Sequence, residues 1–264
     1  MPAPDTTPEA DLALLAEAAA EAGRVAMSFW QRNPKAWDKG GDHGPVSEAD
    51  LAVDAILKEW LCNARPGYGW LSEETPDDLA RLACDQVFVV DPIDGTRAFL
   101  AGEDGFAVSL AVASAGAVTA ALVHLPARGL TYAAITGGPA SRNGAPVAVS
   151  QRTDLTGADV LATRAAMAPE HWPGGVPDLK RSFRTSLAWR LCRVAEGRHD
   201  AMFTFREAWE WDIAAGSLIA ERAGCRVTDR SGAPLRFNAP HPRAPGVIAA
   251  PPALHGAILN QLRA

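Results

Sequence analysis

The chain has 264 residues, of which 48% are hydrophobic and 21% charged, a composition typical of a soluble globular protein. Its formal net charge of −6 argues against a nucleic-acid scaffold, which usually carries a basic stripe. It does not exclude a phosphorylated substrate, because a bound cation can supply positive charge locally. The N-terminus lacks a basic segment and no apolar run reaches the roughly 18 residues of a membrane span, so we expect a cytoplasmic protein without membrane contact.

Helical signals open the chain. Thr6 and Glu9 have capping-box spacing, and apolar residues then recur at helical spacing. A loop rich in glycine and charge follows at residues 38–45. A second helix is predicted to start at Ser47, which has capping-box spacing with Asp50. Its expected apolar face comprises Val53, Ile56, Leu57, Trp60 and Leu61.

The middle of the chain is predicted to form an antiparallel sheet. Short apolar runs are separated by turns, and connections this short favour antiparallel neighbours. Asn143-Gly144 is a further turn signal. The expected strands are residues 86–90, 106–113, 118–125 and 130–135.

Beyond about residue 150 the pattern alternates between strands and helices. The expected strands are residues 160–162, 201–205 and 247–249, and the expected helices are residues 186–195, 212–223 and 253–262. We therefore divide the chain into two halves. Residues 1–150 form an N-terminal α+β half with the antiparallel sheet and most of the acidic site, and residues 151–264 form a C-terminal α/β half that supplies Asp212 and the substrate pocket.

Two carboxylates, Asp91 and Asp94, stand three residues apart after the first predicted strand, where Pro92 is expected to bend the chain. Close carboxylates repel each other and raise one pKa, and a hard divalent cation such as Mg²⁺ removes that cost. Gly95-Thr96 then begins a predicted helical turn, whose free backbone N–H groups can hold a phosphate, while the Thr96 hydroxyl can orient a water. The same residues also favour ordinary turns, so the motif by itself leaves a plain turn open.

Two acidic segments elsewhere in the chain can join this site. Glu73 and Glu74 are adjacent, and one of them could reach the same ion, although such pairs also occur on solvated surfaces. Asp212 precedes a predicted helix, where it can face a ligand or serve as N-cap. Trp209 and Trp211 flank it and can contact a base or sugar.

Arg181 and Arg184 lie ahead of another predicted helix. They can contribute a second phosphate contact or form a solvated basic face.

Together these segments resemble the inositol monophosphatase family of metal-dependent, lithium-sensitive phosphatases. The family's two signatures read approximately W-x-[IV]-D-P-[IL]-D-G-T-x-x-[FY] and W-D-x-A-A-G, and residues 89–99 and 211–216 match them in the same order. The upstream acidic element is matched by Ser72-Glu73-Glu74, and the V-T/S-x-x-D element by residues 46–50. Lys39 stands about where the family carries a lysine in a mobile loop.

The resemblance implies a layered αβαβα sandwich, two or three bound Mg²⁺ ions and a homodimer. It also implies hydrolysis of a phosphomonoester by metal-activated water, with Glu73, Thr96 and Asp50 in catalytic roles. The implied metal ligands are Glu73, Asp91, the Ile93 carbonyl, Asp94, Asp212 and Asp50. The implied substrate contacts are Gly95, Thr96, Asp212, Lys39 and Ser186, the last of which stands in Thr185-Ser186 where many relatives have Gly-Ser.

Two departures bear on the substrate, which the resemblance implies is a small phosphorylated molecule rather than a nucleic-acid polymer. Relatives that act on inositol phosphates usually carry a Glu seven residues before the Asp of the W-D element, where this chain has Phe205. An apolar residue there should disfavour a polyol, because buried hydroxyls without partners are unfavourable. Glu210-Trp211-Asp212 also resembles the E-W-D of the bacterial 3'(2'),5'-bisphosphate nucleotidase subgroup.

We therefore predict a 3'(2'),5'-bisphosphate nucleotidase that converts adenosine 3',5'-bisphosphate to AMP and phosphate. Inositol-1-monophosphatase and histidinol-phosphatase activity are the alternatives within the family, and fructose 1,6-bisphosphate also stays open as a substrate. The alternative of another class is a non-catalytic interaction protein of the same fold.

Overall fold

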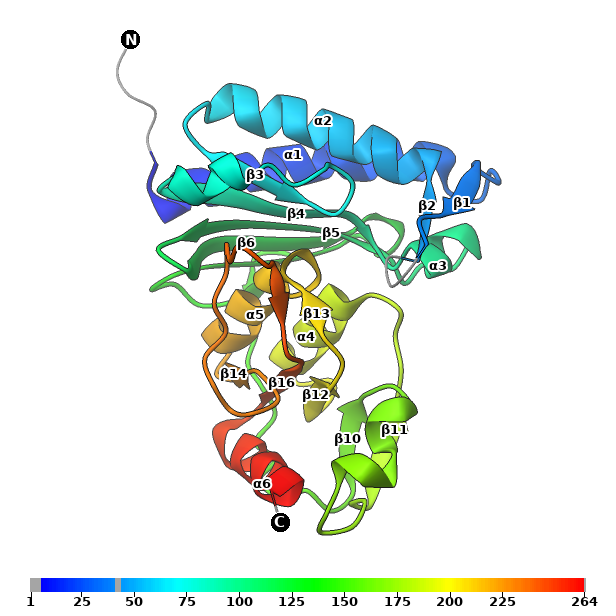
Figure 1. Ribbon diagram of the computed structural model, residues 1–264, viewed down its shortest axis with the longest axis vertical. Coiled ribbons are helices and arrows are strands. Elements are labelled where there is room, and N and C mark those ends of the chain that lie inside the picture. The colour runs from blue at the N-terminus through cyan, green and yellow to red at the C-terminus, as the bar shows by residue number, and fades with distance from the viewer. Residues whose placement is uncertain (1–5, 41–43, 264) are drawn as a thin grey trace.

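Helices and sheets alternate in layers in the computed structural model, which describes residues 6–40 and 44–263 (Figure 1). The long helices are α1 (Pro8–Phe29), α2 (Glu48–Ala64), α4 (Leu187–Ala195), α5 (Glu210–Arg222) and α6 (Pro252–Arg263). α1 and α2 cover one face of a seven-stranded sheet, and α4 and α5 lie between this sheet and a five-stranded sheet. α6 packs on the far side of the smaller sheet. The predicted αβαβα sandwich is confirmed.

The seven-stranded sheet has the order β3-β4-β5-β6-β7-β8-β9, and only its β3–β4 pair is parallel. Its strands are β3 (Gly69–Ser72), β4 (Gln86–Asp94), β5 (Ala107–Ser114), β6 (Ala117–Leu125), β7 (Leu130–Ile135), β8 (Ser141–Arg142) and β9 (Ala145–Pro146). The predicted antiparallel strands are confirmed. So is the predicted turn, because Asn143 (φ 49°) and Gly144 (φ 79°) join β8 to β9 with the positive φ angles of a tight hairpin.

The five-stranded sheet has the order β11-β10-β12-β16-β14 and is mixed, with β10 parallel to both of its neighbours. Its strands are β10 (Ala158–Leu161), β11 (Leu179–Ser182), β12 (Ala201–Thr204), β14 (Arg226–Thr228) and β16 (Val247–Ala250). Two small antiparallel ladders join β1 (Ala36–Asp38) to β2 (Pro45–Ser47) and β13 (Ala208–Trp209) to β15 (Arg243–Ala244). The division of the chain into two halves near residue 150 stays a prediction.

The short helices complete the chain: α3 (Thr96–Leu100), η1 (Leu79–Ala83), η2 (Pro126–Arg128), η3 (Ala165–Met167) and η4 (Pro169–His171). Within the described ranges, no helix combines the length and the apolar character that crossing a bilayer requires.

Three apolar clusters fill the space between the layers. The largest joins α4 and α5 to the inner face of the seven-stranded sheet, a second joins α1 and α2 to its outer face, and a third joins α6 to the five-stranded sheet. The helix α1 lies very close to the large sheet, since a Cβ atom at Gly23 would come within 2.8 Å of the His124 ring on β6. Asp91 and Asp94 lie on β4 of this closely packed sheet.

Two local predictions for the first two helices need correction. The cap of α1 is Thr7 rather than Thr6, and its hydroxyl accepts a hydrogen bond from the Ala10 amide (3.3 Å), with Pro8 at the first helical position. Trp60 does not belong to the buried face of α2, because 40% of it is exposed. The predicted capping box of α2 at Ser47 is confirmed. The glycine-rich stretch at residues 38–45 lies partly outside the described residues, and its ends belong to β1 and β2.

Candidate active site

The strand β4 runs through both aspartates of the central motif. Its pairing with β5 shifts register between Asp91 and Asp94, so the chain forms a β-bulge there. Pro92 falls inside this bulge, where its missing N–H removes no bond of the ladder. The Asp91 carboxylate accepts a hydrogen bond from the Ile93 amide (3.0 Å), which fixes the turn of the bulge. The expectation that the strand ends before Asp91 is therefore wrong: it continues to Asp94 with a bulge.

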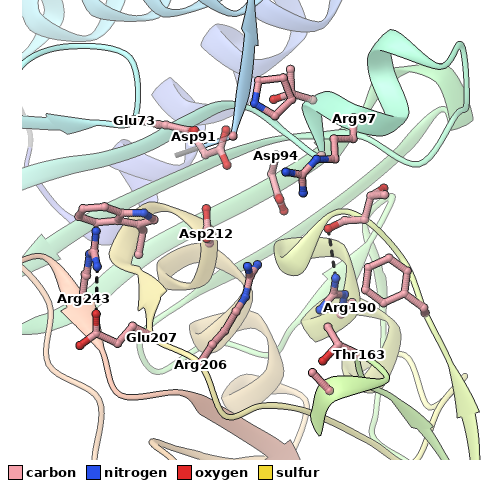
Figure 2. A pocket seen from close by; sticks show the side chains of 18 residues that line it. Glu73, Asp91, Asp94, Arg97, Thr163, Arg190, Arg206, Glu207, Asp212 and Arg243 are labelled. Atoms are coloured by element: carbon pink, nitrogen blue, oxygen red, sulfur yellow. Dashed lines mark hydrogen bonds and ion pairs between the residues drawn. The ribbon is translucent and has the colours of Figure 1, made fainter. Parts of the chain in front are cut away.

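Three acids from distant parts of the chain converge beside this bulge. Glu73, Asp91 and Asp212 each offer a carboxylate oxygen, and these oxygens all lie within 4.8 Å of one another. Glu73 follows β3, which runs parallel to β4, so both acids stand at the same edge of the sheet. Asp212 lies inside the first turn of α5, whose N-cap is Trp209, so the N-cap interpretation of Asp212 is wrong. Figure 2 shows the three carboxylates grouped at one side of a pocket. We call them the acid triad.

The acid triad concentrates negative charge in a buried place. Burial raises the pKa of Asp91 well above its usual range, and repulsion from Glu73 and Asp94 raises it further. Burial also raises the pKa of Asp212 well above its usual range, with Asp94 and Glu73 as the next causes. Carboxylates that repel one another in this way are the donor set that a hard divalent cation stabilises.

The Lys39 ammonium lies against this cluster. Its Nζ atom is 2.7 Å from Glu73 Oε1 and 3.1 Å from Glu74 Oε1. Burial and the charge of Glu73 raise the pKa of Glu74 to about 7, although Lys39 opposes the shift. Lys39 therefore contacts the acids, and its predicted role as a substrate contact stays a prediction.

Asp94 faces the N-terminus of α4. Its Oδ2 atom accepts hydrogen bonds from Ser186 Oγ and the Ala188 amide, both at 2.6 Å, and its Oδ1 atom accepts one from the Leu187 amide at 3.1 Å. The same Ser186 hydroxyl caps α4 by accepting from the Trp189 amide (2.9 Å). A carboxylate at a helix N-terminus is favourable because the unpaired N–H groups and the helix dipole attract it. The predicted roles of Asp94 as metal ligand and of Ser186 as substrate contact stay predictions.

The Thr96 hydroxyl lies between two acceptors, Asp50 Oδ1 (3.0 Å) and the Ile93 carbonyl (3.1 Å). Asp50 is held in turn by the capping box of α2, in which the Ser47 amide donates to its other carboxylate oxygen (2.8 Å). Gly95 precedes α3 with a φ of 101°, a left-handed conformation that favours glycine. The predicted residues Asp50, Ile93, Gly95 and Thr96 are therefore brought together beside the acid triad.

Four arginines that the sequence did not indicate line the same pocket. The cavity has a volume of about 700 Å³. Its basic side chains are Arg97 on α3, Arg190 on α4, Arg206 after β12 and Arg243 on β15. Four separate elements supply them, so no spacing in the sequence could reveal the group. The described residues that line this pocket do not include Arg181 or Arg184, so a phosphate contact by either one is not supported here.

The ring of Trp209, near Asp212, already has stacking partners. Trp209 and Trp211 stack with their ring centres 4.6 Å apart, and the Arg243 guanidinium lies 3.6 Å from the centre of the Trp209 ring. Arg243 is also paired with Glu207 (2.9 Å). Because Trp211 takes one face of Trp209 and Arg243 takes the other, stacking of a base on Trp209 is not favoured. The exposed Phe183 ring lines the same pocket, with the Arg190 guanidinium 4.3 Å from its centre.

Comparisons with known proteins agree with this geometry. The model of the inositol monophosphatase family matches residues 8–264. Over 198 residues, 71% of this chain and 73% of the relative, the chain is 35% identical to an inositol-1-monophosphatase of Rhizobium meliloti (strain 1021). Over 227 residues, 81% of this chain and 82% of the relative, it is 33% identical to a 3'-phosphoadenosine 5'-phosphate phosphatase of Mycobacterium bovis.

The fold is also similar to that of a solved structure. The crystal structure of the extragenic suppressor protein suhB from Bartonella henselae is similar with a TM-score of 0.81 and 29% identity, over 96% of this chain and 98% of that chain. The family model covers almost the whole sequence, and the two relatives from Rhizobium meliloti and Mycobacterium bovis are named phosphatases. The chain therefore belongs to the inositol monophosphatase family and is a phosphatase.

Proposed function

We propose that this phosphatase is a 3'(2'),5'-bisphosphate nucleotidase that converts adenosine 3',5'-bisphosphate to AMP and phosphate. The observation that carries the proposal is that one pocket joins the acid triad to four arginines. A monoester with a single phosphate needs few cationic side chains once a metal ion neutralises it. A surplus of guanidinium groups favours a substrate with further negative charge.

The acid triad supplies the donor set of a Mg²⁺ site. Its oxygens are hard donors, they come from partly or fully buried side chains, and they lie within 4.8 Å of one another, near the spacing of oxygen ligands around one ion. Asp94, Asp50 and the Ile93 carbonyl are the proposed additional ligands of a second or third ion. Bound Mg²⁺ would lower the pKa of a water molecule and neutralise charge on the leaving oxygen.

The chain's own residues bind and orient the reacting groups. The amides of Gly95 and Thr96 would hold the phosphate oxygens at the start of α3. The Thr96 hydroxyl, held by Asp50 and the Ile93 carbonyl, would orient the attacking water. Glu73, whose carboxylate lies within the acid triad, would accept the proton of that water.

The surroundings of Phe205 support a nucleotide over inositol. Phe205 is buried and stacks on Phe203 with ring centres 5.1 Å apart, and it is not among the described residues that line the pocket. Glu207, which follows Phe205 by two residues and does line the pocket, is already paired with Arg243. The pocket thus offers few acceptors for the hydroxyls of a polyol. Its volume of about 700 Å³ is adequate for a nucleotide.

Phosphate release in the presence of Mg²⁺ tests the proposal. We expect a higher kcat/KM for adenosine 3',5'-bisphosphate than for myo-inositol 1-phosphate or histidinol phosphate. Asp91→Asn is expected to release no phosphate from any of them, because it removes a central member of the acid triad. Equal or reversed preference would refute the nucleotidase assignment. Absence of Mg²⁺-dependent release from a broad panel of phosphomonoesters would favour the non-catalytic alternative.

A further inference from the structure

The arginines of the pocket differ in whether their guanidinium groups already have hydrogen-bond or ion-pair partners within the protein. Arg243 is paired with Glu207, and its guanidinium lies on Trp209. Arg190 donates to the carbonyls of Arg184 and Thr185, which ties it to the chain ahead of α4. For Arg206, by contrast, residues 6–40 and 44–263 supply no hydrogen bond or ion pair. A guanidinium that points into a pocket without a partner is available to a ligand.

Arg206 and Arg190 also lie near each other. Figure 2 shows the Arg206 guanidinium pointing into the pocket between Asp212 and Arg190. The pKa of Arg190 is lowered to about 10, chiefly by burial; Asp94 opposes this shift, and the positive charge of Arg206 contributes to it. Two guanidinium groups on neighbouring elements repel each other unless an anion lies between them. When Asp94 and Asp212 bind Mg²⁺, their negative charge no longer offsets the repulsion between the two guanidinium groups.

The reacting phosphate does not account for these two arginines. In the proposed function it binds at the acid triad and at the start of α3, on the side of the pocket where Arg97 lies. Arg206 comes from the segment between β12 and β13, and Arg190 from α4. They are therefore positioned for a different part of the substrate.

We infer that Arg206, supported by Arg190, forms a subsite for a second phosphate group carried by the substrate. The inference rests on the proposed nucleotidase function and adds the residues that recognise the phosphate that is not hydrolysed. The planar guanidinium fork of arginine matches two phosphate oxygens at once, which a lysine ammonium does not. Arg206 is exposed, whereas Arg190 is 3% exposed, so Arg206 is the member that can be altered without disturbing the core.

The test compares two substrates that differ only in the second phosphate: adenosine 3',5'-bisphosphate and adenosine 3'-monophosphate. In Arg206→Ala, kcat/KM for the bisphosphate is expected to fall about tenfold or more, because a charge-assisted hydrogen bond is lost. For the monophosphate we expect a change of less than about twofold. Arg206→Lys keeps the charge and is expected to recover part of the loss. An equal fall for both substrates would overturn the inference, because it would place Arg206 at the reacting phosphate or in the fold.

A second readout does not depend on turnover. AMP retains the 5'-phosphate after hydrolysis, whereas adenosine has none. Arg206→Ala should weaken inhibition by AMP and leave any inhibition by adenosine unchanged; unchanged inhibition by AMP would overturn the inference. The control is Arg198→Ala, which removes an exposed arginine that is not among the described residues lining the pocket, and should alter neither substrate nor product binding.

Failure of the subsite and failure of the proposed function give different results. If the wild-type protein hydrolyses both adenosine phosphates and Arg206→Ala does not discriminate between them, the subsite is wrong and the phosphatase assignment stands. If the wild-type protein hydrolyses myo-inositol 1-phosphate in preference to both, the nucleotidase proposal is wrong. The subsite fails with it, unless Arg206→Ala weakens AMP inhibition alone.

Discussion

Ser186 is expected to stabilise the protein through two hydrogen bonds, and Ser186→Ala removes both. One is the cap of α4, and losing such a cap costs about 1 kcal/mol. The other is donated to the Asp94 carboxylate, and a hydrogen bond to a charged group contributes about 1.5–3 kcal/mol. Asp94 keeps two backbone amide donors, so the losses are expected to add only in part. We expect the free energy of unfolding to fall by about 2–3 kcal/mol.

Urea unfolding in metal-free buffer near neutral pH measures this change. The same variant should lower Tm by roughly 5–10 °C, given the size of the chain. The matched control is Ser217→Ala on α5, since the Ser217 hydroxyl is equally buried but has no hydrogen-bond partner among the described residues. The control is expected to be neutral or slightly stabilising. A loss below about 0.5 kcal/mol for Ser186→Ala, or equal losses for both variants, would refute the reasoning.

Three further outcomes are expected. Saturating Mg²⁺ should raise the Tm of the wild-type protein but not that of Asp212→Asn. In metal-free buffer Asp212→Asn should have a higher Tm than the wild type, because it removes one buried negative charge. A lower Tm for the variant in metal-free buffer would contradict the acid triad. Lys39→Met should lower the Mg²⁺ concentration that gives half-maximal phosphate release, because the Lys39 ammonium competes with the metal for Glu73; an unchanged or higher value would contradict that competition. Burial lowers the pKa of His255 to about 4, whereas the imidazole has a pKa of 6.5 in the unfolded chain. The contribution of His255 to the free energy of unfolding is therefore complete above pH 6.5 and is lost as the pH falls from 6.5 toward 4. Between about pH 7.5 and 5 the wild type should therefore lose about 2 kcal/mol more unfolding free energy than His255→Gln, and parallel pH profiles would count against this assignment.

Local signals in the sequence predicted those features that are stabilised locally. The capping box of Ser47 and Asp50 places the start of α2, because both of its hydrogen bonds join residues three apart or fewer. Asn143-Gly144 predicts its hairpin because positive φ angles at two successive residues favour that dipeptide. Apolar runs predicted the long strands, because the side chains of each run fill a buried face of the sheet.

The path of β4 could not be predicted from the same signals. Pro92 indicated the end of a strand, because proline lacks the N–H that a ladder needs. The structure accommodates it with a bulge, and pairing with β5 resumes at Asp94. Bulges depend on the partner strand, which lies beyond any local window of sequence. Two-residue and three-residue strands such as β13 and β14 were missed because so few residues carry no period.

The tertiary parts of the site were also out of reach. Asp94 and Ser186 are 92 residues apart, and nothing in either segment indicates that the aspartate lies at the N-terminus of α4. The arginines of the pocket come from separate elements, so only the fold brings them together. Several residues named through family resemblance, by contrast, do converge: the acid triad, Gly95 and Thr96 line one pocket, and Asp50 accepts a hydrogen bond from Thr96.

The most direct test of the acid triad is the position of a bound metal ion. Mn²⁺ accepts the same oxygen ligands as Mg²⁺ and can be located by its anomalous X-ray scattering in a crystal of the wild-type protein. We predict an anomalous peak about 2.1–2.2 Å from one oxygen each of Glu73, Asp91 and Asp212. A crystal grown with saturating Mn²⁺ that shows no peak between these carboxylates would contradict the account.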